Sequence, residues 1–253
     1  MVRGILVATE GMIAQSNRAS VYSNNLSNVS TCGFKRDEMG VNSSFSLELR
    51  RIDDGKNSSR PFIGSLNVPD FKYMVEADAS GGSSIQTGNP FDLLIDGSGY
   101  FAVQGKDAKD TIYTRNGNFT LNTKGELITQ EGFNVLGEKG PIVIPSGQKI
   151  TIDEDGRIVA DGKIIDKILI KTFPSLKGIV KTGSTFFLPP ESTPVQSFSG
   201  RVKQGYIEGS NVNTVKEMIN LLEAQKAYQA NEKAIRAEMD ALKEAVSNVG
   251  RVG

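Results

Sequence analysis

Apolar residues near the N-terminus recur at alternating steps of three and four, while Glu10 and Arg18 lie on the opposite side. This spacing places the apolar residues on one stripe of a helix. We therefore predict a helix over residues 1–31, followed by Gly33, a residue type that suits the position just past a helix end. The stripe is thin and comprises Ile5, Ala8, Met12, Gln15, Ala19, Tyr22, Leu26 and Val29.

The last part of the chain repeats this behaviour more strongly over residues 211–249, as a heptad-like seam. Gln225 and Glu232 interrupt the seam, and buried polar residues of this kind cost stability but fix register or partner number. The seam comprises Met218, Leu221, Gln225, Tyr228, Glu232, Ile235, Met239, Leu242, Val246 and Val249. Candidate capping residues at its start are Ser210, Asn211 and Asn213, with Glu217 closing the cap on Thr214.

Between the helices, over residues 65–207, short β-rich runs alternate with turn signals at the spacing typical of an all-β domain. Four of the turns contain an Asp-Gly or Asn-Gly pair, which readily reaches the positive φ angles of tight hairpins, and the fifth contains Lys124-Gly125. They are centred on Gly97, Gly117, Gly125, Gly156 and Gly162. The predicted strands are 91–95, 99–104, 111–115, 126–130, 141–145, 149–153 and 167–173.

The predicted fold class is α+β: an all-β central domain of short antiparallel strands, flanked by N- and C-terminal helices that pair as a coiled coil. Residues 1–31 and 208–253 form the helical domain, and residues 65–207 form the β-rich body. Residues 32–64 are polar with no sustained period, which predicts an extended connector with short strands at most. Two alternatives stay open for the helices: pairing within one monomer only, or packing against neighbouring copies as well.

Composition removes several classes of function. The 29 basic and 29 acidic residues give a formal net charge of zero, which does not favour nucleic-acid binding. The absence of histidine excludes Ser-His-Asp and Cys-His catalysis and histidine metal sites. Cys32 is the single cysteine, so it forms no internal disulfide, and we interpret it as a tolerated small side chain rather than a nucleophile. No segment has the length of a membrane span, and no signal peptide is predicted, so composition by itself predicts a cytoplasmic protein.

Two short motifs resemble ligand sites but lack the required context. Gly97-Ser98-Gly99 is followed by a strand rather than a helix, so we predict a hairpin turn and not a dinucleotide site. The stretch "DEDGRI" at 153–158 lacks the later ligands of a calcium loop, and an Asp-Gly turn explains it better. Paired carboxylates such as Asp153 and Asp155 do not by themselves predict a glycosidase. We predict no catalytic residue, metal or cofactor, and no enzyme activity.

Four stretches resemble bacterial flagellar rod and hook proteins. "NNLSNVSTCGFK" at 24–35 resembles the family's N-terminal signature, and "EGSNVNTVKEMINLLEAQKAYQANEKAI" at 208–235 resembles its C-terminal one. "DLLIDGSGYFAVQ" and "YTRNGNFTLNTKGELIT" resemble the start of the β domain in the rod subgroup. Cys32 stands where relatives commonly carry Asn, Thr or Pro, and Ser27 where Ala is common; neither departure weakens the resemblance.

The resemblance implies a structural subunit of the basal-body rod, which polymerises into the helical axial tube that links the motor to the hook across the periplasm. It implies export by the flagellar type III apparatus without a cleaved signal peptide, no direct membrane insertion, and no enzymatic activity. The implied partners are other copies and other rod or hook axial proteins. Chain length and the short polar connector favour a proximal-rod over a distal-rod protein, whose connector carries an insertion.

In such an assembly we expect asparagine amides and apolar residues at the ends of the arms to contact other subunits, through heterologous contacts that do not close. The predicted interface residues are Asn24, Asn25, Leu26, Asn28, Val29, Thr31, Gly33, Phe34, Ser210, Asn211, Val212, Glu217, Met218, Leu221, Leu222, Gln225, Tyr228 and Asn231. The alternative is a self-contained extracellular β-domain binding module that recognises a protein or a glycan.

Overall fold

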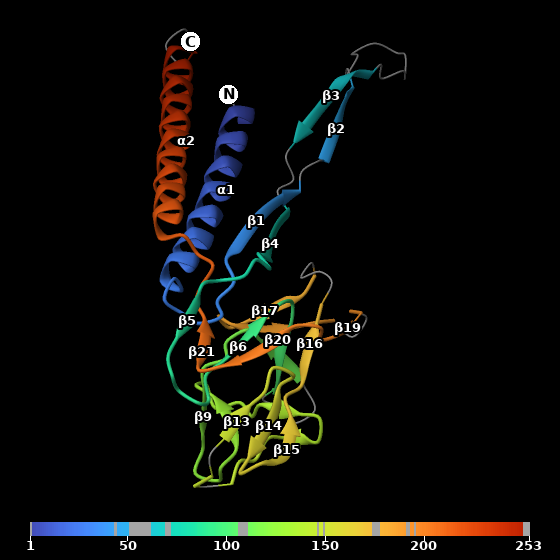
Figure 1. Cartoon of the computed structure of the whole chain (residues 1–253). Helices are drawn as coiled ribbons and strands as arrows, with labels where there is room; N and C mark the ends of the chain where they lie inside the picture. Colours follow the sequence, from blue (N-terminus) through green and yellow to red (C-terminus); the bar gives the residue numbers. More distant parts are fainter. Residues whose placement is uncertain are drawn as a thin grey trace. The chain divides into compact units, whose positions relative to one another are not determined.

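The computed structural model of the chain describes residues 2–42, 45–50, 62–68, 72–105, 111–145, 147–148, 150–173, 178–190, 193–194 and 196–249. Along the sequence, one helix precedes and one follows many short antiparallel strands (Figure 1), so the α+β class with a central β region is confirmed. Contacts divide the chain into two compact units. The first comprises Met1–Tyr22, Glu38–Val75 and Ile219–Gly253, and the second comprises Ser23–Asp37 and Glu76–Met218.

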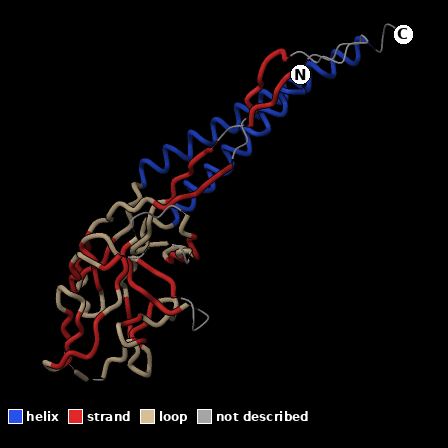
Figure 2. The backbone as a smooth tube through the Cα atoms, turned by 90° about the vertical axis from the view of Figure 1, so that its right-hand side faces the viewer, coloured by secondary structure: helices blue, strands red, loops and turns tan. Residues whose placement is uncertain are grey.

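The helices are α1 (Val2–Ser27) and α2 (Thr214–Val249), close to the predicted ranges. They lie side by side in the first unit (Figures 1 and 2). The Glu238 carboxylate lies against Gly4, and a methyl group at Gly11 would stand 2.7 Å from Nδ2 of Asn231. The two contacts step by seven residues in opposite directions, so the helices run antiparallel.

The predicted stripe of α1 is half-buried throughout, but the predicted seam of α2 is displaced at its start. Glu217 and Ala224 are the buried residues there, at 0% and 3% exposure, whereas Met218 and Tyr228 are 48% and 37% exposed. The displacement arises because polar partners in the second unit bind Glu217. A pattern of apolar residues cannot reveal partners of that kind.

The ends of the helices follow local chemistry. Gly33 has a φ of 67°, in the left-handed region that suits a residue just past a helix end. At the start of α2, the backbone N–H of Lys216 donates to Oδ1 of Asn213 at 3.0 Å, so Asn213 is the capping residue. The prediction that Glu217 closes this cap is wrong, because its carboxylate binds Asn25 and Arg36 instead.

Of the strands of the first unit, β1 (Asp37–Asn42), β2 (Phe45–Arg50) and the start of β3 (Phe62–Val68) lie in the predicted connector, residues 32–64, whereas the rest of β3 and all of β4 (Lys72–Ala77) lie in the range predicted as the β body. β1 pairs with β4. β2 pairs antiparallel with β3. Both pairs are two-stranded ribbons rather than parts of a larger sheet, whereas the second unit contains the main sheet. The division into independent domains stays a prediction.

The second unit is built on a six-stranded antiparallel sheet in the order β17-β18-β8-β7-β16-β19. Its strands are β17 (Val180–Thr182), β18 (Phe186–Leu188), β8 (Thr111–Thr114), β7 (Tyr100–Gln104), β16 (Ile170–Thr172) and β19 (Gln196–Ser197). A three-stranded sheet consists of β13 (Ile150–Ile152), β14 (Arg157–Ala160) and β15 (Lys163–Lys167). The pairs are β5 (Ser84–Gln86) with β21 (Tyr206–Glu208), β6 (Leu93–Asp96) with β20 (Arg201–Gln204), β9 (Phe119–Leu121) with β10 (Leu127–Thr129), and β11 (Leu136–Gly137) with β12 (Gly140–Pro141).

Most predicted strands are confirmed within a residue or two, but two are wrong. Residues 167–173 divide between β15 and β16, which belong to different sheets. Residues 141–145 contain only the end of β12 and a bridge at Val143. There Ile142 donates to Val135 and Ile144 donates to Gly125, so the backbone bonds go to different segments and form no continuous ladder.

Gly97-Ser98-Gly99 opens no helix, as predicted, but the expected hairpin is wrong. The turn leads from β6, which pairs with β20, to β7, which pairs with β8 and β16. The two flanking strands therefore lie in different sheets. The turn bends around the Arg115 guanidinium, which a sequence pattern has no means of showing.

The main core of the second unit gathers aliphatic and aromatic side chains from both sheets and from β6, β9, β10 and β20. The side chains of Phe101 and Phe119 are 0% and 1% exposed, and their rings meet edge-to-face with centroids 5.1 Å apart. Tyr100, Phe173 and Phe187 form a smaller cluster on the opposite side of β7. Alternate residues of β7 thus supply both clusters, as the two-residue period of a strand requires.

Candidate functional site

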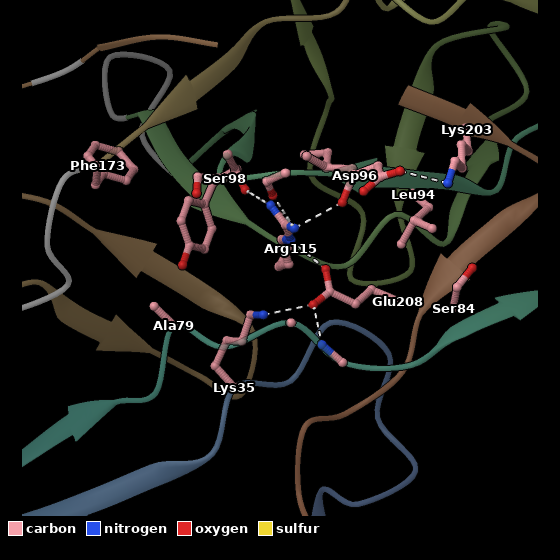
Figure 3. Close-up of a pocket in the computed structure, with 16 residues that line it drawn as sticks. Lys35, Ala79, Ser84, Leu94, Asp96, Ser98, Arg115, Phe173, Lys203 and Glu208 are labelled. Atoms are coloured by element: carbon pink, nitrogen blue, oxygen red, sulfur yellow. Dashed lines mark hydrogen bonds and ion pairs between the residues drawn. The ribbon is translucent and has the colours of Figure 1, made fainter. Parts of the chain in front are cut away.

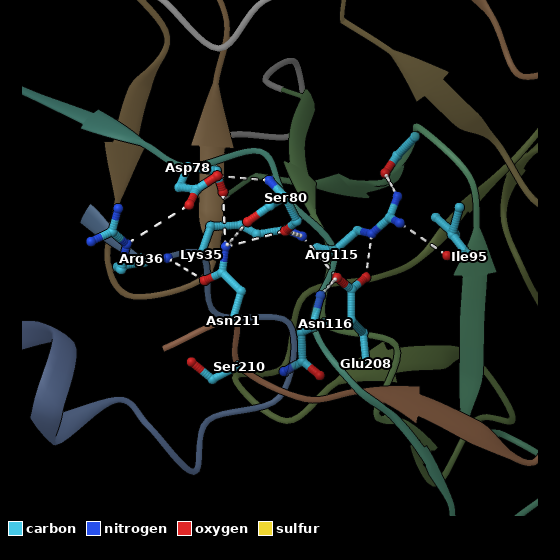
Figure 4. A network of polar contacts seen from close by, with 12 residues as sticks. Lys35, Arg36, Asp78, Ser80, Ile95, Arg115, Asn116, Glu208, Ser210 and Asn211 are labelled. Carbon is cyan, nitrogen blue, oxygen red and sulfur yellow. Dashed lines mark hydrogen bonds and ion pairs between the residues drawn. The ribbon is translucent and has the colours of Figure 1, made fainter. Parts of the chain in front are cut away.

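The candidate site lies within the second unit and is built around the buried carboxylate of Glu208, at the end of β21 (Figure 4). Its Oε1 accepts from the Lys35 ammonium at 2.7 Å and from the backbone N–H of Gly82 at 2.8 Å. Its Oε2 accepts from Nε of Arg115. Lys35, Arg115 and Glu208 are 1%, 8% and 3% exposed, so water does not screen these ion pairs as it does on a surface. We call these three residues the ion cluster.

Arg115 also orders the turn between β6 and β7. Its guanidinium donates to the carbonyl of Ile95 at 2.9 Å, to that of Gly97 at 2.6 Å, and to that of Gly99. A planar guanidinium offers five donors in a fixed fork, which a lysine ammonium does not. One side chain therefore binds the C-terminal segment and shapes the turn at the start of β7.

The pKa shifts of the cluster reflect burial opposed by charge. Burial by itself raises the pKa of Glu208, but the positive charges of Arg115 and Lys35 outweigh it and hold this pKa below its ordinary value. Burial lowers the pKa of Lys35, and the Glu208 carboxylate opposes that shift. Glu208 thus stays ionised at neutral pH, where it balances one of the two cations.

A cavity of about 440 Å³ lies beside the ion cluster (Figure 3). Tyr100 and Phe173 line one part of it, and an ion pair between Lys203 and Asp96, 2.7 Å apart, lines another. Burial raises the pKa of Tyr100 to about 12. Both carboxylate oxygens of Glu208 in this wall accept from protein groups, so the cluster is a structural core and offers no free reactive carboxylate.

Asn211 connects the start of the C-terminal segment to two other parts of the second unit (Figure 4). Its Oδ1 accepts from the backbone N–H of Arg36 at 2.7 Å. Its Nδ2 lies 3.2 Å from the carbonyls of Asp78 and Ser80 and 3.0 Å from Oγ of Ser80. The amide therefore holds residues 36, 78–80 and 211 together within one chain.

Asn25 and Glu217 form a second buried contact, at the ends of α1 and α2 that belong to the second unit. Nδ2 of Asn25 lies 3.2 Å from Oε2 of Glu217, and Oε1 of Glu217 forms an ion pair with Arg36 at 3.4 Å. The Asn25 amide also bonds the backbone of Asp37 in both directions, at 2.8 and 2.9 Å. One asparagine side chain thus bonds both the N–H and the carbonyl of Asp37, as the backbone of a neighbouring strand would.

Lys181, on the edge strand β17, also binds the segment that follows α1. Its ammonium lies 2.7 Å from Oδ1 of Asp37, donates to the carbonyl of Lys35 at 3.0 Å, and stands 3.9 Å from the centre of the Phe34 ring. A cation over an aromatic face is an attractive arrangement. Phe34 is 1% exposed, so this contact anchors the segment rather than presenting it to solvent.

The predicted interface residues divide into three groups by exposure. Four are buried within the chain: Asn25, Gly33, Phe34 and Glu217. Nine are half-buried: Leu26, Asn28, Val29, Thr31, Ser210, Asn211, Val212, Leu221 and Asn231. Five are exposed: Asn24, Met218, Leu222, Gln225 and Tyr228. The amides of Asn25, Asn28 and Asn211 have partners in the same chain, and contact of these residues with other subunits stays a prediction.

Sequence reasoning missed Lys35, Arg115, Glu208 and Lys181. Lysine, arginine and glutamate are usually exposed, so their burial carries no signal in a single sequence. One signal was available, since Lys35, Arg115 and Glu208 each lie in a different stretch that resembles the rod family.

Cys32 is half-buried, three residues before Lys35. Burial, assisted by the negative charge of Asp92, raises the pKa of its thiol. Among the described residues no group of side chains is arranged to hold a metal ion.

Comparison with known proteins locates three regions of likeness. A family model described as "Flagella basal body rod protein" matches residues 5–35. "Flagellar hook protein FlgE/F/G D1 domain" matches residues 94–160, and "Flagellar basal body rod FlgEFG protein C-terminal" matches residues 203–248. The chain is 32% identical over 252 residues to the flagellar basal-body rod protein FlgG of Agrobacterium fabrum, which covers 92% of this chain and 94% of the relative. The chain belongs to the flagellar basal-body rod protein family.

Other members of the rod family show the same extent of likeness. FlgG of Bacillus subtilis is 31% identical, with 98% of this chain and 99% of the relative covered. FlgF of Caulobacter vibrioides is 28% identical over the whole of both chains. Rod-family proteins are structural, so this chain is a structural subunit of the flagellar basal-body rod and not an enzyme. It assembles with other rod and hook proteins in the basal body.

Membership in the rod family gives the ion cluster a context. Lys35 is the last residue of the first matched region, Arg115 lies in the second, and Glu208 lies in the third. The three regions therefore meet at one buried carboxylate. Among the described residues no helix is long and apolar enough to cross a membrane.

Proposed function

We propose that this chain polymerises into the helical axial tube of the rod, that its terminal helices pair as a coiled coil, and that they contact neighbouring copies. The observation that carries the proposal is a row of exposed apolar side chains along the start of α2. Val215, Met218, Ile219 and Leu222 are 68%, 48%, 50% and 55% exposed, at the spacing of one helix face. A contiguous exposed apolar row of this kind is typical of an interaction surface.

The same face contains two of the predicted interface residues, Met218 and Leu222, and Tyr228 lies further along α2. Val7 and Ile13 of α1 are also exposed, at 60% and 50%. Helices that bury only a narrow stripe against each other leave such residues for further helices. The contacts proposed here are heterologous, and contacts of that type generate open helical assemblies when the rotation does not close.

The remaining expectations belong to the same proposal. The domains are residues 1–31 with 208–253, the connector 32–64 and the body 65–207. Export proceeds through the flagellar type III apparatus without a cleaved signal peptide, and the rod position is of the proximal type. The support for these points is the resemblance of the sequence to the family. Family membership favours the rod subunit over a self-contained binding module.

Electron microscopy of concentrated protein tests polymerisation, with Leu222→Asp as the disrupting variant. The expected result is tubes or filaments from the wild-type chain and none from the variant, because a carboxylate on the apolar row opposes its burial. Ile164→Asp is the matched control, since Ile164 is a similarly exposed apolar residue, 63% accessible, on β15. Filaments from Leu222→Asp at the wild-type concentration would contradict the proposed surface.

A further inference from the structure

Residues 201–217, which we call the closing segment, come at the end of the second unit along the chain yet pair with strands near its start. β20 pairs with β6 from Arg201↔Asp96 to Gln204↔Leu93, and β21 pairs with β5. Val202 is 2% exposed and belongs to the main core. Strands β5 and β6 come early in the second unit along the chain. They therefore obtain these pairing partners only when the end of the unit is present.

Gln204 extends this dependence to a third region. Its Nε2 donates to the carbonyl of Pro90 at 2.8 Å and lies 3.3 Å from that of Ile150. Its Oε1 accepts from the backbone N–H of Ile152 at 3.2 Å. One side chain of the closing segment thus joins the loop before β6 to β13, and contacts between segments so distant in sequence form late when a chain folds.

The N-terminal segment, residues 28–37, docks on the closing segment. The backbone N–H of Gly33 donates to the carbonyl of Glu208 at 2.7 Å, and that of Arg36 donates to Asn211 at 2.7 Å. Lys35 is buried on the Glu208 carboxylate. Without the closing segment, Lys35 and Arg115 would face each other with no carboxylate between them. Burying two like charges without a counter-ion is strongly unfavourable.

We propose that the closing segment controls when the second unit forms: residues 28–37 dock only after residues 201–217 have paired and Glu208 has entered the ion cluster. A chain that leaves a channel N-terminus first would keep this unit open until its C-terminal part has emerged. The inference rests on the proposed export of the chain for its biological setting. Its physical content concerns the isolated monomer and is testable there.

Cys32 is a built-in reporter, because it is the single cysteine of the chain and lies half-buried in the docking segment. The first test measures its rate of alkylation in dilute full-length protein. Glu208→Gln keeps the shape of the side chain but removes its charge. The expected result is alkylation at least about tenfold faster, because the segment opens when its buried cations lose their partner. Glu131→Gln, at an exposed carboxyl on the same unit, leaves the rate unchanged.

Asn211→Ala provides a second variant in case Glu208→Gln unfolds the whole unit. It removes the bonds to Arg36, Asp78 and Ser80 but leaves every charge in place. Hydrogen exchange of the β7 amides distinguishes local opening from global unfolding. Faster alkylation of Cys32 with protected β7 amides supports the inference. Wild-type alkylation rates in Asn211→Ala and in a folded Glu208→Gln would overturn it.

The order of events is tested with chains arrested on the ribosome at increasing lengths, so that residues up to 200, then residues up to 217, then the whole chain lie outside the ribosome. Cys32 is expected to remain fully reactive until residue 217 has emerged. Protection of Cys32 while only residues up to 200 are outside would overturn the inference. Both tests use monomers, so a chain that passes them but forms no tubes contradicts the proposed function and not this inference.

Discussion

Nδ2 of Asn25 and Oε2 of Glu217 lie 3.2 Å apart, across 192 residues of sequence, and both side chains are fully buried. The contact joins the end of α1 to the start of α2 inside the second unit. Through this contact Asn25, a poor helix former, and Glu217, a charged residue, give each other a hydrogen-bond partner. A buried pair of this type is costly to break, because each partner left alone is an unsatisfied polar group.

Asn25→Ala is therefore expected to lower the free energy of unfolding by about 1–3 kcal/mol, since Glu217 and the backbone of Asp37 lose their partner. Urea denaturation measures the change. Asn24→Ala is the matched control, because Asn24 is the exposed neighbour on the same helix and alanine favours helix at both positions. Equal effects of the two substitutions would refute the structural role given to Asn25.

Gly33→Ala tests the close approach of two backbones. A methyl group at Gly33 would stand 2.6 Å from Cα of Asn116, and the residue also has a φ of 67°. Gly132 has a φ of 88° with nothing within 4 Å of a methyl group, so Gly132→Ala reports the backbone strain alone. We expect about 1 kcal/mol of destabilisation at Gly132 and at least about 3 kcal/mol at Gly33, measured by thermal or urea unfolding. Similar losses at both positions would exclude the steric contact.

Arg115→Lys preserves charge but removes the guanidinium fork. The expected loss is at least about 2 kcal/mol of unfolding free energy, because lysine cannot serve Glu208 and the carbonyls of Ile95, Gly97 and Gly99 together. Arg201→Lys controls for the substitution itself, as the side chain of Arg201 is 71% exposed. Its effect is expected within about 0.5 kcal/mol. Tolerance of lysine at 115 would show that charge alone is required.

The pH dependence of stability follows from the lowered pKa of Glu208. A carboxyl whose pKa is lower in the folded state stabilises fully above its unfolded value, about 4.5, and loses this contribution as pH falls through the folded value. We expect the difference in unfolding free energy between the wild-type chain and Glu208→Gln to be largest near neutral pH. It should narrow below pH about 4.5, because a protonated glutamate resembles glutamine.

Denaturant titrations of both proteins from about pH 7 to about pH 3, on either side of the ordinary glutamate pKa of 4.5, measure this narrowing. Glu131→Gln, which removes an exposed carboxyl, should show a small difference throughout. A difference between the wild-type chain and Glu208→Gln that stays constant to the lowest pH would mean that ionisation of Glu208 does not stabilise the fold. The substitution would then act through shape or hydrogen bonding alone.

The sequence by itself determined the local structure of this protein. The three-four spacing predicted both helices, because the period of a helix is imposed by its own geometry. Asp-Gly pairs predicted the turns at Gly97, Gly156 and Gly162, and Gly33 predicted the end of α1, because positive φ angles depend on the residue type at that position. The tight turn predicted at Asn116-Gly117 is wrong, since Gly117 has no positive φ. Resemblance of four stretches to rod proteins indicated the family, which the comparisons then confirmed.

Only the tertiary structure decided which polar residues are buried and where the strands pair. Nothing near Lys35, Arg115 or Glu208 in sequence predicts that they meet, because each is solvated unless the other two supply opposite charge and hydrogen bonds. The same reason displaced the buried side of α2 to Glu217 and separated β6 from β7 around Arg115. Local patterns record what a segment does with its own backbone. The partners of a buried charge come from segments that only folding brings together.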